Sequence, residues 1–260
     1  MKQFIKTYWK TLLFFIVIGL VGGFFVGIYQ LESYPEEIKQ QLIEEIKKSG
    51  LGDFPVDIIL GIVSAYQSML YGLVLGAVGI LLGKRIGLWQ DEIKVEKTAL
   101  TSTVIFSVVG GIVMILSDVL AFGKYSTALM DLYAAKPSVP YIIATVTYGA
   151  VIEEVMLRLF FMSLIAFILY KLFEKGTEKP SKSVLIISNI IASLLFAAGH
   201  LPITSILFGL TPIYIFRCFI LNGGLGLLFG YLYRKYGLRY SMIAHGGCHI
   251  VSKLIWILFI

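Results

Sequence analysis

Two adjacent carboxylates and an arginine interrupt an apolar stretch in the second half of the chain, at Glu153, Glu154 and Arg158. An ionisable side chain at bilayer depth is strongly unfavourable unless it is paired or faces water. On an α-helix, Glu154 and Arg158 share one face with the acid on the N-terminal side, which is the better orientation for an ion pair. Glu153 lies about 100° from Glu154 around the helix. We therefore expect Glu154 and Arg158 to pair and Glu153 to stay free for acid–base chemistry. A purely structural ion pair is the alternative.

The chain contains three histidines, and all of them lie in apolar segments. Phe196 and His200 are four residues apart at the end of one expected helix, so they share a helix face. His245 and His249 have the same spacing on another expected helix. A single histidine in such surroundings is more often a hydrogen-bonded core residue. Three histidines together with two glutamates and an arginine instead predict one shared acid–base site.

The composition indicates which kind of fold must position these residues. Of the 260 residues 58% are apolar, and the mean hydropathy is +0.86, both far outside the range of soluble globular domains. We predict an all-α membrane protein, a polytopic bundle of about seven transmembrane helices with eight possible, because a helix of about 20 apolar residues crosses a bilayer. The first helix shows no trustworthy cleavage signature and is expected to be retained. Segments of sufficient length lie near 11–29, 58–83, 100–121, 139–170, 184–201, 205–233 and 240–260.

The lysines and arginines are distributed unevenly over the segments that connect these helices. Loops rich in these residues usually stay in the cytoplasm, so their positions predict an orientation with a cytoplasmic N-terminus. The net charge of +6 reflects this bias and gives no support for nucleic-acid binding, which needs a solvated basic face. Fourteen basic residues lie in 1–10, 84–97, 171–182 and 234–239, against five in 30–57, 122–138 and 202–211.

Two connecting segments predict structure of their own. Residues 36–49 begin with acids after Pro35 and end with lysines and a glycine, which are helix start and stop signals. A short external amphipathic helix along the membrane surface is expected there. Residues 203–211 are apolar but too short to span the bilayer, and Pro212 separates them from the next helix. We expect a re-entrant or interfacial piece over the site.

The chain is expected to divide into an N-terminal part, residues 1–138, with transmembrane helices 1 to 3, and a catalytic transmembrane core, residues 139–260. Within the core, Phe196 and Asn222 are expected to line the substrate pocket. Outside it, Asp118 lies near the outer end of the third helix, where a carboxylate can reach the membrane interface. The first three helices otherwise have the glycines and apolar residues of a packing scaffold.

The charged and histidine motifs resemble those of the CPBP family, the group of membrane proteins that includes CAAX proteases and bacteriocin-processing (Abi) proteins. The resemblance covers roughly residues 139–253, and the order, spacing and membrane context of the motifs all agree. The family's three motifs, EExxxR, FxxxH and HxxxN/D, are matched here by Glu153, Glu154 and Arg158, by Phe196 and His200, and by His245, with a histidine at position 249.

The resemblance implies a role for each of these residues. In the family, the first glutamate and the histidine of the second motif are taken to activate a water for peptide hydrolysis, which implies Glu153 with His200 here. The last motif is taken to stabilise the oxyanion, which implies His245 with His249. Because His249 replaces an asparagine or aspartate, the geometry of its hydrogen bond differs, and an imidazole is also a better metal ligand. No cofactor is required, but a zinc site built from Glu153, His200, His245 and His249 is chemically possible.

The expected function is that of an intramembrane endopeptidase, similar to type II CAAX prenyl endopeptidases, in which a glutamate-activated water hydrolyses a peptide bond. The expected partners are the lipid bilayer and a membrane-associated protein or peptide, of CAAX type or of leader or bacteriocin type. The alternative is a non-enzymatic bacteriocin-immunity or scaffold protein that binds peptides in the same cavity. A proton-relay transporter is less favoured, since the sequence shows no clear internal repeat.

Overall fold

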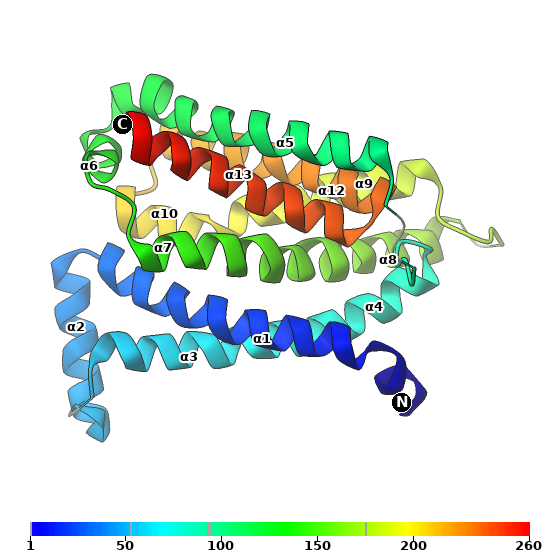
Figure 1. The fold of residues 1–260 in the computed structure, drawn as a ribbon, viewed down its shortest axis with the longest axis horizontal. Helices are drawn as coiled ribbons and strands as arrows, with labels where there is room; N and C mark the ends of the chain where they lie inside the picture. The colour runs from blue at the N-terminus through cyan, green and yellow to red at the C-terminus, as the bar shows by residue number, and fades with distance from the viewer. Residues whose placement is uncertain (1, 53, 93–94, 175) are drawn as a thin grey trace.

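The computed structural model describes residues 2–52, 54–92, 95–174 and 176–260. Every regular element in this part of the chain is a helix, and most of the helices run side by side along the long axis of the molecule (Figure 1). The predicted all-α fold is confirmed.

The helices occur in the following order, with π-helical and 3₁₀ segments labelled η. The first half contains α1 (Lys2–Ser33), α2 (Glu36–Ile46), η1 (Lys47–Leu51), α3 (Val56–Leu70), η2 (Tyr71–Leu75), α4 (Gly76–Arg85), α5 (Lys97–Leu116), η3 (Ser117–Ala121), η4 (Phe122–Tyr125) and α6 (Thr127–Ala134). The second half contains α7 (Val139–Ala144), η5 (Thr145–Glu153), η6 (Val155–Met162), α8 (Ser163–Phe173), α9 (Lys182–Gly199), α10 (Leu201–Phe208), α11 (Pro212–Cys218), η7 (Phe219–Gly223), α12 (Gly224–Tyr236) and α13 (Leu238–Phe259).

Seven helical stretches of the described chain are long and apolar enough to cross a membrane, so the predicted bundle of seven spans is confirmed. The chain is an integral, multi-pass membrane protein. The spans are Lys2–Ser33, Val56–Arg85, Lys97–Tyr125, Val139–Phe173, Lys182–Phe208, Pro212–Tyr236 and Leu238–Phe259.

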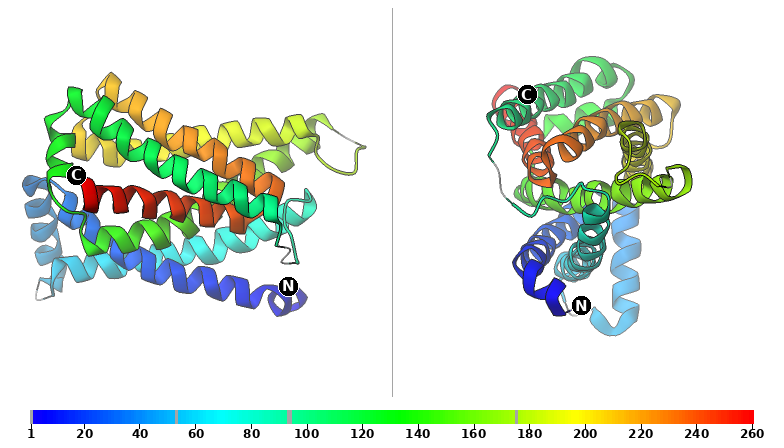
Figure 2. Two further views of the ribbon diagram at one scale, coloured as in Figure 1. Left: turned by 45° about the horizontal axis from the view of Figure 1, so that its top comes forward. Right: turned by 90° about the vertical axis from the view of Figure 1, so that its right-hand side faces the viewer.

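The spans pack in two layers with the fourth span between them (Figures 1 and 2). One layer contains α1 beside α3 and α4, and the other contains α5, α9, α12 and α13. Close contact between α1 and α3 depends on small residues, because a Cβ at Gly19 would lie 2.7 Å from the carbonyl oxygen of Ser68. The predicted division of the chain at residue 138 stays a prediction, although α5 packs along α13 in the same layer.

The fourth span, Val139–Phe173, positions the two glutamates and the arginine. Its N-cap is Ser138, whose hydroxyl accepts a hydrogen bond from the backbone N–H of Tyr141, and Pro140 occupies its first turn. From Thr145 to Met162 most of the backbone follows the wider turns of a π-helix. Such turns are rare in proteins and frequently occur at functional sites. The α-helical spacing assumed from the sequence is therefore only approximate around Glu153 and Glu154.

Two shorter helices occupy the predicted connecting segments. α2 covers most of the expected external helix and lies across the end of α1 and α3 (Figure 1). α10 occupies most of the short apolar segment before Pro212, and it ends at Gly209, whose φ of 76° a glycine adopts without strain. The preceding helix α9 ends at His200, where the chain turns, so His200 lies at the corner between α9 and α10.

The expectation for Asp118 is wrong. Instead of reaching the membrane interface, Asp118 is 1% exposed and forms a bidentate ion pair with Arg217, with distances of 2.6 Å to Nε and 2.5 Å to Nη2. The hydroxyl of Tyr133 also donates to Asp118, at 2.7 Å. Burial and the nearby carboxylate raise the pKa of the Tyr133 phenol, which keeps this donor protonated. The physical reason for the burial is a partner on α11, which sequence spacing does not reveal.

Candidate active site

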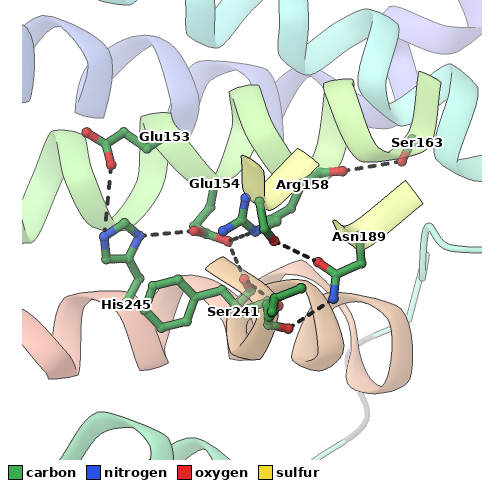
Figure 3. A network of polar contacts seen from close by, with 10 residues as sticks. Glu153, Glu154, Arg158, Ser163, Asn189, Ser241 and His245 are labelled. Carbon is green, nitrogen blue, oxygen red and sulfur yellow. Dashed lines mark hydrogen bonds and ion pairs between the residues drawn. The ribbon is translucent and has the colours of Figure 1, made fainter. Parts of the chain in front are cut away.

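The carboxylate of Glu154 lies at the centre of a buried polar network that joins the fourth span to α13 (Figure 3). Its side chain is 0% exposed. One oxygen lies 3.0 Å from Nδ1 of His245, and the other accepts a hydrogen bond from the hydroxyl of Ser241. Nε of Arg158 lies 3.5 Å from this second oxygen, so the predicted ion pair is present. Buried carboxylates are stable in proteins only when they are paired and hydrogen-bonded in this way.

Two neighbouring turns of α13 supply the contacts of Glu154 across the helix interface. Ser241 and His245 are four residues apart and therefore face the same neighbour. Ser241 also bonds to the carbonyl of Phe229, at 3.0 Å, which ties α12 into the network. Counting residues from the helix ends places Glu154 deeper in the membrane than His245. The structure brings them into contact because α13 runs obliquely to the fourth span (Figure 1).

Arg158 is completely buried, and its guanidinium lacks hydrogen-bond partners in the described chain. Its side chain is 0% exposed, and none of its guanidinium nitrogens has a hydrogen-bond acceptor among the described residues. The guanidinium lies over the ring of Phe196, with 5.1 Å between Cζ and the ring centroid. A Cβ at Gly226 would lie 3.2 Å from Nη2, so the glycine leaves the space that the guanidinium occupies. Electrostatic attraction to Glu154 is thus the main interaction that favours this buried charge.

Glu153 points in another direction and has different surroundings. Its side chain is 21% exposed, and Oε2 lies 3.9 Å from Nε2 of His245 (Figure 3). No hydrogen bond ties this carboxylate to any other described side chain, and it lines a cavity. The predicted difference between the two glutamates is therefore present, since Glu154 is paired with Arg158 and Glu153 is not. A carboxylate in this position can take up a proton from a bound water.

His245 is held between the two glutamates. Its ring stacks on Phe229, with 4.5 Å between the centroids, and meets the edge of Phe196 at 5.9 Å. These contacts and the bond to Glu154 leave the ring little freedom to rotate, so Nε2 stays on the side of Glu153. An imidazole that is fixed in this way can donate or accept a proton at a defined point in the cavity.

His200 is oriented by the backbone of its own helix. Nδ1 lies 2.8 Å from the carbonyl oxygen of Phe196, and because a carbonyl only accepts hydrogen bonds, Nδ1 carries the proton. Nε2 of the neutral ring is then free to accept one. The ring also meets the ring of Phe196 edge-on, at 4.8 Å, so the predicted contact between these two residues is present.

His249 has a buried nitrogen without a partner. Its ring stacks on that of His245, with 5.0 Å between the centroids, and its Nδ1 has no hydrogen-bond partner among the described residues. A Cβ at Gly149 would lie 3.3 Å from Nε2 of His249, so this glycine allows the imidazole to approach the fourth span. Asn222, the other predicted pocket residue, contacts the sulfur of Cys218 at 3.5 Å.

The predicted residues divide into two groups around a cavity of about 580 Å³, a size typical of ligand sites. Glu154 and Arg158 do not line it. They contact residues that do, since Glu154 bonds to His245 and Arg158 lies over the ring of Phe196. Ser241, which bonds to Glu154, and Phe229, which stacks on His245, were not predicted from the sequence. Ser241 could have been found from its position four residues before His245. The predicted residues that do line the cavity are Glu153, Phe196, His200, Asn222, His245 and His249.

The four residues considered as zinc ligands line one cavity but do not form a metal site in this arrangement. Among the described residues, no three His, Cys, Asp or Glu side chains are placed to hold one ion.

Comparison with protein families identifies the part of the chain that contains this site. The family model for type II CAAX prenyl endopeptidase Rce1-like proteins matches residues 135–251. Residues 135–251 form an Rce1-like domain. All six cavity-lining residues above lie within this domain, as do Glu154, Arg158 and Ser241. The match supports membrane protease activity in general. Neither the curated proteins nor the solved structures contain a significant match to the chain.

Replacing Arg158 tests the buried ion pair. We expect Arg158→Ala to reduce the free energy of unfolding by about 3–5 kcal/mol, since it leaves Glu154 buried without its counter-charge. Thermal unfolding of the purified protein in detergent measures the effect, with the exposed Arg85→Ala as the matched control. The double variant Glu154→Gln, Arg158→Met should be less destabilised than the sum of the two single variants. Equal melting temperatures for Arg158→Ala and Arg85→Ala would contradict the importance of the pair.

Proposed function

We propose that the protein is an intramembrane endopeptidase in which Glu153 activates a water molecule to hydrolyse a peptide bond of a membrane-associated protein or peptide. The observation that carries the proposal is the difference between two adjacent glutamates. Glu154 is fully buried and its carboxylate is engaged on both oxygens, whereas Glu153 has no hydrogen bond to any described residue and lines the cavity beside an imidazole. Different surroundings for neighbouring carboxylates are typical of sites that separate a structural from a catalytic acid.

Hydrolysis at this site requires one water and one proton carrier. Glu153 takes a proton from the water as its oxygen adds to the carbonyl carbon of the peptide bond. When the C–N bond breaks, the same carboxyl group gives the proton to the leaving nitrogen, and the carboxylate is restored. The bare Nε2 of His200 can accept the second hydrogen of the water and so orient it. Both residues line the cavity, in agreement with the roles that the family resemblance implies.

His245 and His249 are proposed to stabilise the negative oxygen that develops in the tetrahedral intermediate. When both nitrogens of His245 carry protons, Nδ1 donates to Glu154 and Nε2 offers a donor to the cavity next to Glu153. His249 stacks beside it and can supply the second donor. Positioned donors of this kind typically account for 10²–10³-fold of the rate each, roughly 3–4 kcal/mol. The aromatic rings around His245 hold the donor in place before the substrate binds.

The shape of the cavity suggests from which side of the membrane a substrate enters. Its lining extends to the end of the bundle where α1 ends and α7 begins, through Tyr34, Tyr133 and Phe208. Among the described residues, none of its lining comes from the basic segments 84–92, 95–97, 171–174, 176–182 or 234–239, which lie at the opposite end (Figure 1). If these basic segments are cytoplasmic, the cavity is reached from the outer side. This orientation favours a leader- or bacteriocin-type substrate over a cytoplasmic CAAX protein.

Glu153→Gln should abolish hydrolysis while the protein still folds. The amide keeps almost the same volume but is not a base, so we expect the rate to fall at least about 100-fold. Quantitative proteomics of host membranes identifies peptides whose processing disappears, and the purified protein is then assayed on those peptides. Glu37→Gln on the exposed face of α2 is the matched control. Normal turnover by Glu153→Gln would refute the general-base role, and peptide binding without any cleavage by the wild type would favour the non-enzymatic alternative.

His249→Asn distinguishes an oxyanion donor from a zinc ligand. The substitution restores the residue that the family motif usually contains, so a donor role predicts activity that is kept or raised. A zinc ligand would instead be lost, because asparagine binds zinc poorly, and both the metal content and the rate would fall sharply. The measurement is elemental analysis of both purified proteins together with assays with and without a chelator. Stoichiometric zinc in the parent that disappears with activity in His249→Asn would overturn the assignment to a donor.

The proposed orientation predicts which residues an impermeant reagent reaches. In right-side-out membranes, a maleimide that cannot cross the bilayer should label Gln40→Cys on α2 and leave Glu178→Cys unlabelled until the membrane is opened. Both positions are exposed, and the two native cysteines are buried, which keeps the background low. Added peptide should be cleaved by right-side-out vesicles in preference to inverted ones. The reverse labelling pattern would place the cavity mouth in the cytoplasm.

A further inference from the structure

The second span, Val56–Arg85, carries two adjacent polar side chains on its outer surface, Tyr66 and Gln67. Both are exposed, and both lie in the central third of the span, about 15–17 Å from where it begins. In the central third of any span of the described chain, they are the only exposed polar residues. Exposed positions at this depth face lipid acyl chains or another protein. Acyl chains offer no hydrogen bonds, so polar groups there are unfavourable without a protein partner.

Within its own chain, this pair keeps unused hydrogen-bonding groups. Nε2 of Gln67 donates to the hydroxyl of Tyr71, one turn further along the helix. An amide has two N–H donors and an acceptor oxygen, so this bond leaves Oε1 and one N–H of Gln67 without a partner among the described residues. The hydroxyl of Tyr66 likewise bonds to no described residue. A donor and an acceptor thus stand side by side on the lipid-facing surface.

The surface of α3 around this pair has the pattern of a helix–helix seam. α1 packs along the side of α3 that contains Gly61 and Ser68. On the outer side, Val63, Tyr66 and Leu70 are exposed by 58%, 60% and 37%. Their intervals of three and four residues match the apolar row along which two parallel helices pack. Polar residues in or beside such a row fix the register and the number of helices.

The symmetry of a membrane favours a second copy of this chain as the partner. All copies have the same orientation in the bilayer, so two copies related by a two-fold axis along the membrane normal place the same residue at the same depth. Tyr66 can then donate its proton to Oε1 of Gln67 in the other copy. The two-fold axis repeats this bond in the opposite direction. Both unused groups are satisfied by contacts that only a second α3 supplies at this depth.

We propose that the protein forms a dimer in the membrane, in which α3 of one copy packs against α3 of a second copy through Tyr66 and Gln67. The interface lies outside residues 135–251, which form the Rce1-like domain. No described residue of α3 lines the cavity, and α3 lies on the other side of the fourth span from α5 and α13 (Figure 2). Dimerisation therefore leaves the cavity accessible, and the inference does not depend on the proposed function.

The test measures the dimer fraction of the purified protein in liposomes over a range of protein-to-lipid ratios, by single-molecule photobleaching. We compare the wild type, Tyr66→Phe, Gln67→Leu and the double variant. The control is Thr101→Val, which removes an exposed hydroxyl of α5 that bonds only within its own helix. Each single variant should raise the dissociation constant about 10-fold or more, because it removes both symmetric hydrogen bonds. The double variant should be little worse than either, and Thr101→Val should match the wild type.

Cross-linking locates the interface independently of these hydrogen bonds. Single cysteines are introduced at Val63 and Leu70 in the row on α3, and at Val104, which is 59% exposed on α5. On oxidation in liposomes, Val63→Cys and Leu70→Cys should form disulfides between two copies, and Val104→Cys should not. Both native cysteines are buried, which keeps the background low.

Several results would overturn the inference. A protein that stays monomeric at every density has no such dimer. A dimer that Tyr66→Phe and Gln67→Leu leave unchanged, or that cross-links at Val104→Cys and not at Val63→Cys, uses another surface. If the purified protein is monomeric and Val63→Cys cross-links to a different protein in host membranes, the seam on α3 belongs to that partner and not to a second copy.

Discussion

The burial of the Glu154 carboxylate is the constraint on which the site depends. A carboxylate with no access to water must be paired, and here its partners come from its own helix, through Arg158, and from α13, through Ser241 and His245. These contacts determine how α13 crosses the fourth span and which way the imidazole of His245 faces. The adjacent Glu153 lines the cavity and has no hydrogen bond to any described residue. One carboxylate thus orients the site and the other is available to react.

The same principle accounts for the charges at the far end of the cavity. Asp118 and Arg217 form a bidentate pair and stabilise the junction of η3 with α11. Lys253 has no such partner among the described residues, and its Nζ lies 4.2 Å from the ring centroid of Tyr141. Glu153, beside His245, and Lys253 lie at the two ends of the row that His245 and His249 form on α13.

Local features of this site could be predicted from the sequence, and contacts between distant segments could not. The pairing of Glu154 with Arg158, the contact of Phe196 with His200 and the seven spans follow from helical periodicity and segment length. Counting residues from the helix ends places Glu154 and His245 at different depths in the membrane, because such a count assumes helices parallel to the membrane normal. In the structure these two residues are in contact. Asp118 was expected at the interface because its partner on α11 is far away in the sequence. The tilt of a helix and the partner of a buried charge depend on tertiary packing, which the periodicity of a single segment does not reveal.

Single-turnover hydrolysis in water enriched with ¹⁸O tests most directly whether Glu153 activates a water molecule. The measurement uses a peptide whose cleavage requires Glu153, followed by mass spectrometry of both the products and the protein segment that contains this residue. Direct attack by water predicts one ¹⁸O atom in the new carboxylate of the product and none in Glu153. An ¹⁸O atom in the Glu153 carboxylate would show that the glutamate itself attacks the peptide and would contradict the mechanism.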